Sequence, residues 1–339
     1  MGTPLHRRGF LLGSVAALAT SGHTTGAAPR PSRVASLRLQ EGGADWQAVE
    51  QALGASGMPA EGDVFRVGMP RTDLEVTVRG VPVKAGFALG SYAAFKHIGP
   101  TAGDTVVMGD LVLLDAEVNP VISGLFQGGL TITALHNHLL GMTPHLMYLH
   151  YAGAGDAVPL ATAIRQALSA SKTPLGEATA AGGSTGGEVA VGGGSPAAGT
   201  AVAGVDTARI EQILGHRGKL NGGVLSVSVP RAETITMGMP GMTDRMDVPP
   251  AMGVAIAMNF QPTGDGTTAI TGDFVLIASE VNPVAQALGE HGIEVEALHN
   301  HALDDEPRLF YMHFWANDDP ITLARGLRAA LDRTNSATP

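Results

Sequence analysis

One pattern occurs twice in this chain. The first copy reads Glu117-Val118-Asn119-Pro120, then Leu135-His136-Asn137-His138, then Tyr148-Leu149-His150. The second reads Glu280-Val281-Asn282-Pro283, then Leu298-His299-Asn300-His301, then Tyr311-Met312-His313. A single shift of 163 residues (His136 to His299) superimposes the two copies, and it also pairs Gly109-Asp110 with Gly272-Asp273. Self-similarity at a fixed offset predicts two copies of one fold.

Length and composition limit the possible classes of protein. A chain of 339 residues favours two domains. Charged residues make up only 15% of the chain while Gly is abundant at 46, which favours strands and loops over long salt-bridged helices. The net charge of -10 argues against a nucleic-acid partner, so the letters His-Asn-His do not indicate a nuclease. The absence of Cys excludes disulfides and zinc-thiolate sites.

The N-terminal segment has the features of an export signal. Arg7 and Arg8 precede Gly9-Phe10-Leu11, a short apolar run follows, and small residues lead to Ala27-Ala28. The run is too short to span a membrane, and the paired Arg is typical of a twin-arginine signal. We expect residues 1–28 to be a signal peptide and the protein to be periplasmic or secreted.

The order of predicted elements is the same in both halves. Each half shows a helix after an Asp N-cap (Asp45, Asp206), alternating strands, a helix starting at Asn119 or Asn282, two strands carrying the histidines, and a closing helix. This predicts an α+β fold of two sandwich repeats, 45–170 and 205–333, with antiparallel or mixed sheets. Residues 171–204, rich in Gly, Ala, Ser and Thr, are expected to be a linker.

The histidine spacing suggests a metal site. Side chains two apart on a strand share a face, so His136 and His138 point the same way and Asn137 points away. His150 lies on the next strand, and Glu117 lies at the exit of another. We expect the metal ligands to be His136, His138, His150 and Glu117 in the first repeat and His299, His301, His313 and Glu280 in the second. Such a set suits Zn first, and also Mn, Fe, Ni or Cu.

The other repeated residues are given structural roles. Asp110 and Asp273 are expected at turns or strand ends rather than as ligands. Arg71 and Arg231 are expected in surface salt bridges, with pairing to the Glu carboxylate or to a substrate anion as the alternative. Tyr148 and Tyr311 either donate a hydrogen bond to a ligand or pack in the core. His145 is matched by Arg308 in the second copy, so we expect no ligand role for it. The remaining histidines of the mature chain, which have no counterpart, are expected at the surface, namely His97, His216 and His291.

With these motifs, the chain resembles the LppY/LpqO family, bacterial envelope proteins with a duplicated domain of unknown function. The resemblance covers residues 45 to 333 and implies an envelope location, but it brings no activity. Named members are lipoproteins, whereas this chain has no Cys, so we expect no lipid anchor. The His-x-His strand is also similar to that of cupins, which makes cupin-like β-barrel repeats the alternative fold.

Three functions follow from these observations. The first is an exported protein that binds a transition metal. The second is a metal-dependent, hydrolase-like enzyme in which Glu117 or Glu280 is the general base. The third is a binding module for a small ligand or a cell-wall component. The expected partners are a metal ion and a small molecule, with the two repeats packed on each other and either two separate metal sites or one shared site between them.

Overall fold

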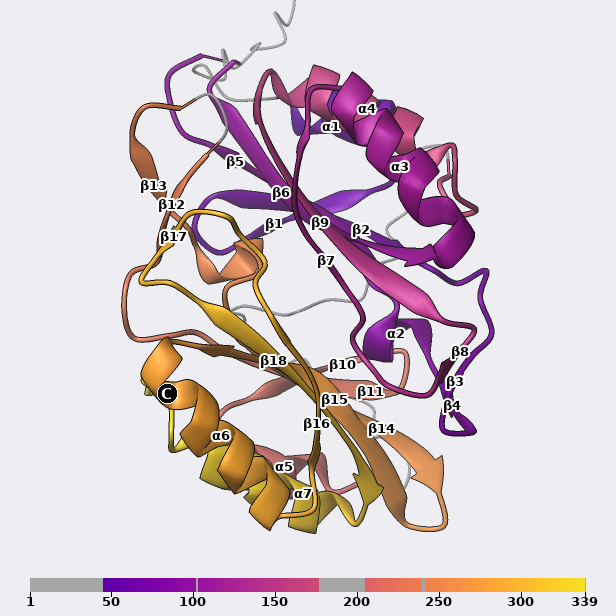
Figure 1. Ribbon diagram of the computed structural model, residues 1–339, viewed down its shortest axis with the longest axis vertical. Coiled ribbons are helices and arrows are strands. Elements are labelled where there is room, and N and C mark those ends of the chain that lie inside the picture. The colour runs from indigo at the N-terminus through magenta and orange to yellow at the C-terminus, as the bar shows by residue number, and fades with distance from the viewer. Residues whose placement is uncertain (1–44, 102, 177–204, 240–241, 339) are drawn as a thin grey trace, which may run out of the picture. The chain divides into compact units, whose positions relative to one another are not determined.

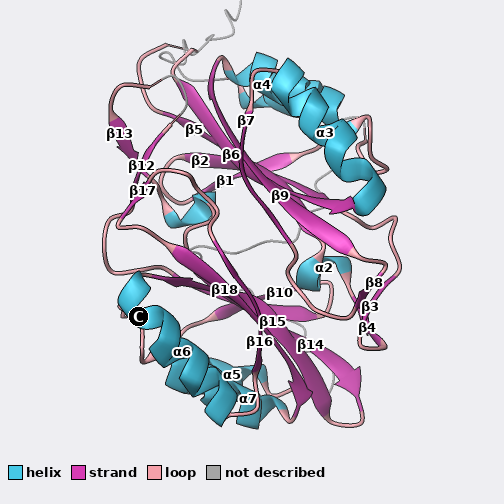
Figure 2. Ribbon diagram, viewed as in Figure 1, coloured by secondary structure: helices cyan, strands magenta, loops and turns pink. Residues whose placement is uncertain are grey.

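Each repeat is built on one open, six-stranded antiparallel sheet with helices on one face (Figures 1 and 2). The computed structural model describes residues 45–101, 103–176, 205–239 and 242–338. The expected signal peptide (1–28) and residues 177–204 of the expected linker therefore lie outside the described part of the chain.

The first repeat has its strands in the order β1-β2-β5-β6-β9-β7. Their bounds are β1 (Gly57–Ala60), β2 (Val64–Pro70), β5 (Gly90–His97), β6 (Thr105–Leu114), β9 (Leu146–Gly155) and β7 (Thr131–His136). Its helices are α1 (Trp46–Leu53), α3 (Asp115–Gln127) and α4 (Ala157–Leu168).

The second repeat has the same topology, with the order β10-β11-β14-β15-β18-β16. Its strands are β10 (Gly218–Asn221), β11 (Val224–Val229), β14 (Ile256–Gly264), β15 (Thr267–Leu276), β18 (Phe310–Asp318) and β16 (Glu294–His299). Its helices are α5 (Thr207–Leu214), α6 (Ala278–Glu290) and α7 (Pro320–Leu331).

Each repeat also extends a short arm between its second and third sheet strands. In repeat 1 the arm holds β3 (Val76–Val78), β4 (Val81–Val83) and α2 (Ala85–Ala88), and β3 also pairs with β8 (Met142–Thr143). In repeat 2 it holds β12 (Thr236–Gly238), β13 (Arg245–Asp247) and the 3-10 turn η1 (Pro250–Met252), with β12 also paired to β17 (Asp305–Glu306).

The arms are exchanged between the repeats, which belong to one compact unit. The α2 segment packs against β14 and β15, and η1 packs against β2 and β5. Polar contacts fix the exchange: Asn259 Nδ2 donates to Phe87 O at 3.1 Å, and Gln261 Nε2 donates to Pro82 O at 2.8 Å.

Alternation along the strands gives each sheet two different faces. In β6, Leu111 and Leu113 point into the core beneath the helices, together with Val121 and Ile164. Val106, on the opposite face, belongs to a core shared with the second repeat. The face turned away from the helices is therefore available to meet the other repeat.

The expected fold class is confirmed: the chain is α+β, with two copies of an antiparallel sheet covered by helices. Both six-stranded sheets of the described residues are open, with edge strands β1 and β7 or β10 and β16, rather than closed cupin-like barrels. The expected helix starts at Asn119 and Asn282 are wrong. The helices begin four residues earlier, so Pro120 and Pro283 lie inside them.

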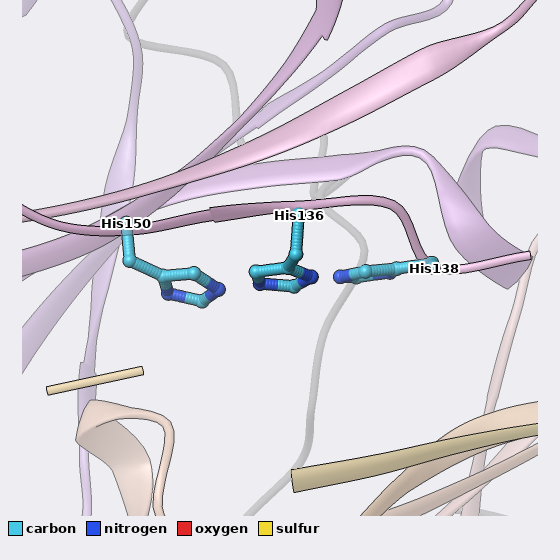
Figure 3. Close-up of side chains that lie close together, drawn as sticks. All are labelled: His136, His138 and His150. Atoms are coloured by element: carbon cyan, nitrogen blue, oxygen red, sulfur yellow. The ribbon is translucent and has the colours of Figure 1, made fainter. Parts of the chain in front are cut away.

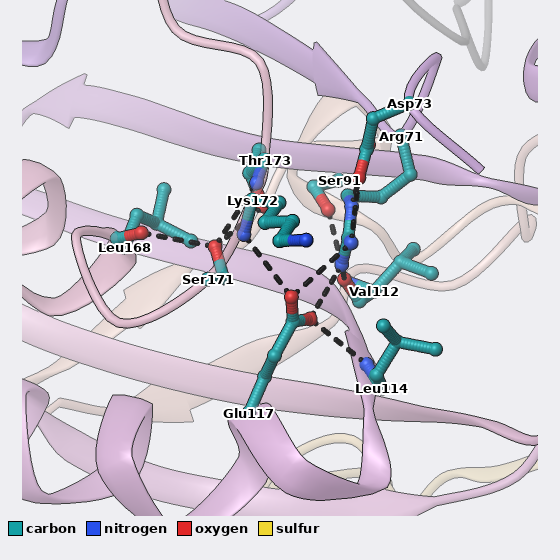
Figure 4. Close-up of polar contacts among 10 residues, drawn as sticks. All are labelled: Arg71, Asp73, Ser91, Val112, Leu114, Glu117, Leu168, Ser171, Lys172 and Thr173. Atoms are coloured by element: carbon teal, nitrogen blue, oxygen red, sulfur yellow. Dashed lines mark hydrogen bonds and ion pairs between the residues drawn. The ribbon is translucent and has the colours of Figure 1, made fainter.

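The earlier start has a physical cause, which Figure 4 shows for repeat 1. Glu117 occupies the third position of α3 and accepts a hydrogen bond from Leu114 N–H, an N-terminal donor that otherwise has no partner in the helix. The same carboxylate accepts from Arg71 Nη1 at 2.7 Å, from Arg71 Nη2 at 3.3 Å and from Lys172 N–H at 3.0 Å. Arg71 also donates to Val112 O, which fixes the end of β6.

Repeat 2 contains the same network. Glu280 accepts from both terminal nitrogens of Arg231 and from the backbone N–H groups of Ile277 and Asn335. The expectation that Arg71 and Arg231 form surface salt bridges is wrong, because the two residues are only 0% and 6% exposed.

We predict that Glu117→Gln destabilises the protein without lowering the metal content of the folded fraction. Removing one partner of a buried ion pair leaves Arg71 uncompensated, at a cost of roughly 3 kcal/mol. Urea unfolding monitored by circular dichroism measures the loss, with exposed Glu61→Gln as the control, for which we expect a change below about 0.5 kcal/mol. Stability equal to wild type, or loss of metal without loss of stability, would contradict the structural role.

Candidate functional site

All six motif histidines gather where the two sheets face each other. The ring of His136 stacks on its counterpart His299 with centroids 3.5 Å apart. The remaining four form two reciprocal pairs across the repeats, His138 with His313 at 3.7 Å and His150 with His301 at 3.8 Å. This pairing relates the repeats by an approximate twofold axis that passes through the His136–His299 pair. The histidines thus make one composite site.

Strand register brings the three histidines of each repeat together (Figure 3). His136 ends β7 and lies opposite Tyr148 of β9, while His150 lies two residues farther along β9, on the same face. His138 follows the end of β7, so it is placed by the loop rather than by strand alternation. Its ring centroid is nevertheless 5.1 Å from that of His136, and Figure 3 shows His136 between His138 and His150.

The two tyrosines support the histidine rings. Tyr148 stacks on His138 with centroids 3.2 Å apart, and Tyr311 stacks on His301 at 3.5 Å. Tyr148 Oη donates to Ala88 O at 2.7 Å, so its hydroxyl anchors the arm of repeat 1 instead of a ligand. Both tyrosines are buried, so the expected core packing is confirmed. The alternative, a hydrogen bond to a ligand, is wrong: Tyr148 Oη donates to a backbone carbonyl, and Tyr311 Oη has no hydrogen-bond partner among the described residues.

Two carboxyl groups join the site that were expected at turns. Asp110 lies in the middle of β6 opposite His150, and Asp273 lies in the middle of β15 opposite His313. Asp110 Oδ1 is 3.8 Å from His150 Nε2, and Asp273 Oδ2 is 3.6 Å from His301 Nε2. The expectation for both residues was therefore wrong.

The glycine before each Asp explains why the sequence suggested a turn. A Cβ on Gly109 would lie 2.5 Å from Tyr92 O, and one on Gly272 would lie 1.8 Å from Ala257 O. These glycines allow close approach of the neighbouring strand, so here they mark tight strand packing rather than a turn. The signal that could have revealed the Asp residues was their exact repetition at the 163-residue shift.

Burial controls the charge state of the site. Loss of hydration lowers the pKa of His136 to about 4 and that of His313 to about 3. The pKa values of His138, His150, His299 and His301 are also lowered, first by burial and then by neighbouring histidines. Burial raises the pKa of Asp110 to about 7 and that of Asp273 well above its ordinary range. The six imidazoles are therefore neutral at pH 7, which is the form that binds metals.

Several buried atoms of the site make no hydrogen bond within the described residues. They include Nε2 of His136, His138, His150 and His313, Nδ1 of His299, and Oδ1 of Asp110 and Asp273. Nδ1–H of His313 donates to Gly272 O at 2.8 Å, and Nδ1–H of His136 donates to Asn137 O at 3.1 Å. These backbone bonds favour the tautomer in which Nε2 carries a lone pair directed into the site.

Three groups of potential ligand atoms converge within 4.8 Å. They are His136, His138 and His150; His136, His299 and His301; and Asp273, His301 and His313. The first and the third share no residue. The second spans the two repeats.

The structure places the expected carboxylate ligands elsewhere. The four carboxylate oxygens of Glu117 and Glu280 accept hydrogen bonds from Arg71 or Arg231 and from backbone N–H groups, and neither residue belongs to a convergent ligand group among the described residues. We correct the expected ligand set accordingly: each Glu is a helix-capping residue, and the carboxylates beside the histidines are Asp110 and Asp273.

The remaining expected residues lie outside the cluster. Asn300 Nδ2 donates to Thr133 O of the first repeat at 3.2 Å, in keeping with a side chain turned away from the ligands. His145 is exposed and lies 2.7 Å from Asp115 Oδ1. His291 is exposed too, whereas His97 and His216 are half-buried.

We predict that the metal-free protein loses stability as the pH falls from 7 to 4. Below about pH 6.5 the unfolded chain binds protons at these histidines, whereas the folded protein does not. The free energy of unfolding therefore falls by about 1.4 kcal/mol per pH unit for each histidine. Asp110 and Asp273 act in the opposite direction, because their raised pKa values let the folded state bind protons first. The destabilising effect of the six histidines exceeds the stabilising effect of the two aspartates, so the net stability falls on acidification.

Urea unfolding in the presence of a chelator, at several pH values, measures this dependence. His136→Gln should flatten it, whereas the exposed control His145→Gln should leave it unchanged. A folding free energy that stays constant or increases on acidification would contradict burial of neutral histidines.

Similarity to other proteins identifies the family but no activity. Curated proteins include no significant match. Two solved structures align over most of the chain, both with a TM-score of 0.19. One is the trimeric bacterial microcompartment shell protein PduB, 13% identical, with 85% of this chain and 96% of that chain covered. The other is EtuB from Clostridium kluyveri, 8% identical, with 82% and 91% covered.

These two likenesses are too weak to support an argument about fold or function. The family match is extensive, since it covers residues 47–170 and again 208–333, which are the two repeats. The chain therefore belongs to the family described as Domain of Unknown Function (DUF1259), and it carries two copies of that domain.

Proposed function

We propose that this protein binds transition-metal ions in the composite site between its repeats. One ion is held by His136, His138 and His150, and a second by Asp273, His301 and His313. The observation that carries the proposal is the set of buried imidazole nitrogens without hydrogen-bond partners in the described residues.

The energetic cost of these atoms favours a metal over a purely structural role. Each buried polar atom left without a partner costs about 1–3 kcal/mol. A cluster that served only for packing would pair its nitrogens with backbone groups, as Nδ1 of His313 does. A bound cation turns the same lone pairs into ligand bonds.

The donor set indicates the kind of ion. One group has three imidazole nitrogens and the other has two with one carboxylate. Both sets suit Zn, Mn, Fe, Ni and Cu(II), and we propose Zn first. Each group supplies three protein ligands, which leaves at least one coordination position for water or another molecule.

The general-base hypothesis for Glu117 and Glu280 is not carried forward. Their carboxylates are already occupied by buried Arg side chains and by helix N-termini. A metal-assisted reaction at this site would have to use groups that face the histidines. We propose a small ligand as a second partner of the metal site.

We also propose that the protein acts in the bacterial envelope after twin-arginine export. The support is the sequence Arg7-Arg8-Gly9-Phe10-Leu11 with its short apolar run, and the resemblance to LppY/LpqO proteins. Among the described helices, none is both long and apolar enough to cross a membrane.

We predict up to two metal ions per chain after incubation with Zn²⁺ and removal of excess ion. His138→Ala should remove one ion by breaking the group of repeat 1, and His313→Ala should remove the other. Elemental analysis of the purified protein measures the content, with His145→Ala as a matched control that changes an exposed histidine and should keep both ions. A folded wild-type protein that retains none of Zn, Mn, Fe, Ni or Cu would refute the proposal.

A second prediction concerns export. Changing Arg7 and Arg8 to Lys should retain the precursor in the cytoplasm, because the twin-arginine pathway recognises the Arg pair. Cell fractionation with immunoblotting measures the distribution. Equal amounts of processed protein outside the cytoplasm for both versions would exclude this route.

A further inference from the structure

The two halves of the composite site differ on the strands that flank the aspartates. In repeat 1, Tyr92 of β5 lies opposite Asp110. In repeat 2, the same position opposite Asp273 is occupied by Ala257 of β14. One strand farther out, Arg66 of β2 corresponds to Ser226 of β11. Two large side chains in one half are thus replaced by two small ones in the other.

Tyr92 and Arg66 fill the Asp110 half. The Arg66 guanidinium lies 3.5 Å above the Tyr92 ring, and Arg66 Nη1 donates to Ala251 O of the second repeat at 2.8 Å. Backbone of repeat 2 packs directly on the phenol, since a Cβ on Gly253 would lie 2.4 Å from Tyr92 Oη. A separate cavity between Tyr92 and Tyr311 measures only about 10 Å³.

A larger cavity lies beside both aspartates, and most of its apolar lining comes from α2 and β14. It measures about 140 Å³, enough for a molecule of several heavy atoms. Small residues of α2 and β14, including Ala85, Gly86 and Ala257, line its apolar wall. Its polar lining comes from both repeats. Asp273, His301 and His313 all line it, and so do Arg66, Asp110 and two histidines of the other metal group, His138 and His150.

We propose that this cavity admits a small carboxylate anion, which binds the ion held by Asp273, His301 and His313 while its charge faces Arg66. This inference rests on the proposed metal site and assigns its second ligand. A three-ligand centre of two His and one carboxylate leaves coordination positions open toward the cavity. A planar guanidinium is suited to pairing with a carboxylate, and the apolar wall strengthens that attraction.

The cavity lining distinguishes the two metal groups. Asp273, His301 and His313 all line the cavity, whereas His136 of the other group does not. A molecule in the cavity therefore lies beside the complete Asp273 group.

The test uses the full-length protein loaded with Co²⁺, whose visible absorption reports changes in its ligands. Titration with acetate should shift the spectrum to saturation, whereas acetamide, of the same shape but uncharged, should leave it unchanged. Ala257→Tyr copies the residue of repeat 1 into the cavity and should weaken the acetate response by about tenfold or more while the Co²⁺ content stays the same. Ala257→Leu is a second variant in case the tyrosine prevents folding.

Arg66 is tested separately. Arg66→Gln should weaken acetate binding by about tenfold, and Arg66→Lys, which keeps the charge, should recover part of it. The proposal is overturned if both Ala257 variants respond to acetate as the wild type does, or if acetate and acetamide give equal responses. It is also overturned if acetate leaves the spectrum of the Co²⁺-loaded wild type unchanged. A folded wild type that binds no Co²⁺ overturns the proposed metal function itself, so the two failures are distinguishable.

Discussion

Six neutral imidazoles buried against one another form the constraint on which the rest of this structure depends. Desolvation keeps them uncharged, which allows three pairs of rings, two stacked and one tilted, to lie with their centroids 3.5–3.8 Å apart without repulsion between cations. Reaching this arrangement requires each sheet to leave one face uncovered by its own helices. It also requires each repeat to pass an arm over the other, so that the edges of the cluster are closed by α2 on one side and η1 on the other.

The buried Arg–Glu pairs hold in place the strands and helices that surround this cluster. In each repeat one Arg binds the carbonyl at the end of the Asp-bearing strand, and one Glu caps the helix that follows. Val112 and Val275, whose carbonyls are held, stand two residues from Asp110 and Asp273. The pair thus fixes where the strand stops and, through it, where the carboxylate sits. Its repetition beside the histidines reflects a shared framework rather than a shared ligand set.

Much of the architecture could be predicted from the sequence because its signals are local. Strand alternation, Asp N-caps and a constant shift of 163 residues are enough to predict two α+β repeats and to select the six histidines. The sequence predicts Glu117 beside the histidines and Asp110 at a turn, and both predictions are wrong because each position depends on a partner distant in sequence. Arg71 lies 46 residues from Glu117 and donates hydrogen bonds to its carboxylate. His150 lies 40 residues from Asp110 in the chain but opposite it in the sheet. The cross-repeat pairs, which join residues such as His136 and His299, have no sequence signal beyond the repeat itself.

The approximate twofold axis through His136 and His299 has an evolutionary consequence. A single repeat contains three of the six rings, so two separate identical copies could assemble the whole cluster only as a symmetric dimer. In such a dimer every substitution appears twice, and both aspartates would have the same neighbour. Joining the copies in one polypeptide removes that restriction. Tyr92 and Ala257 occupy equivalent places, and this difference cannot exist between two identical chains. It gives the two aspartates of an otherwise symmetric site unequal neighbours.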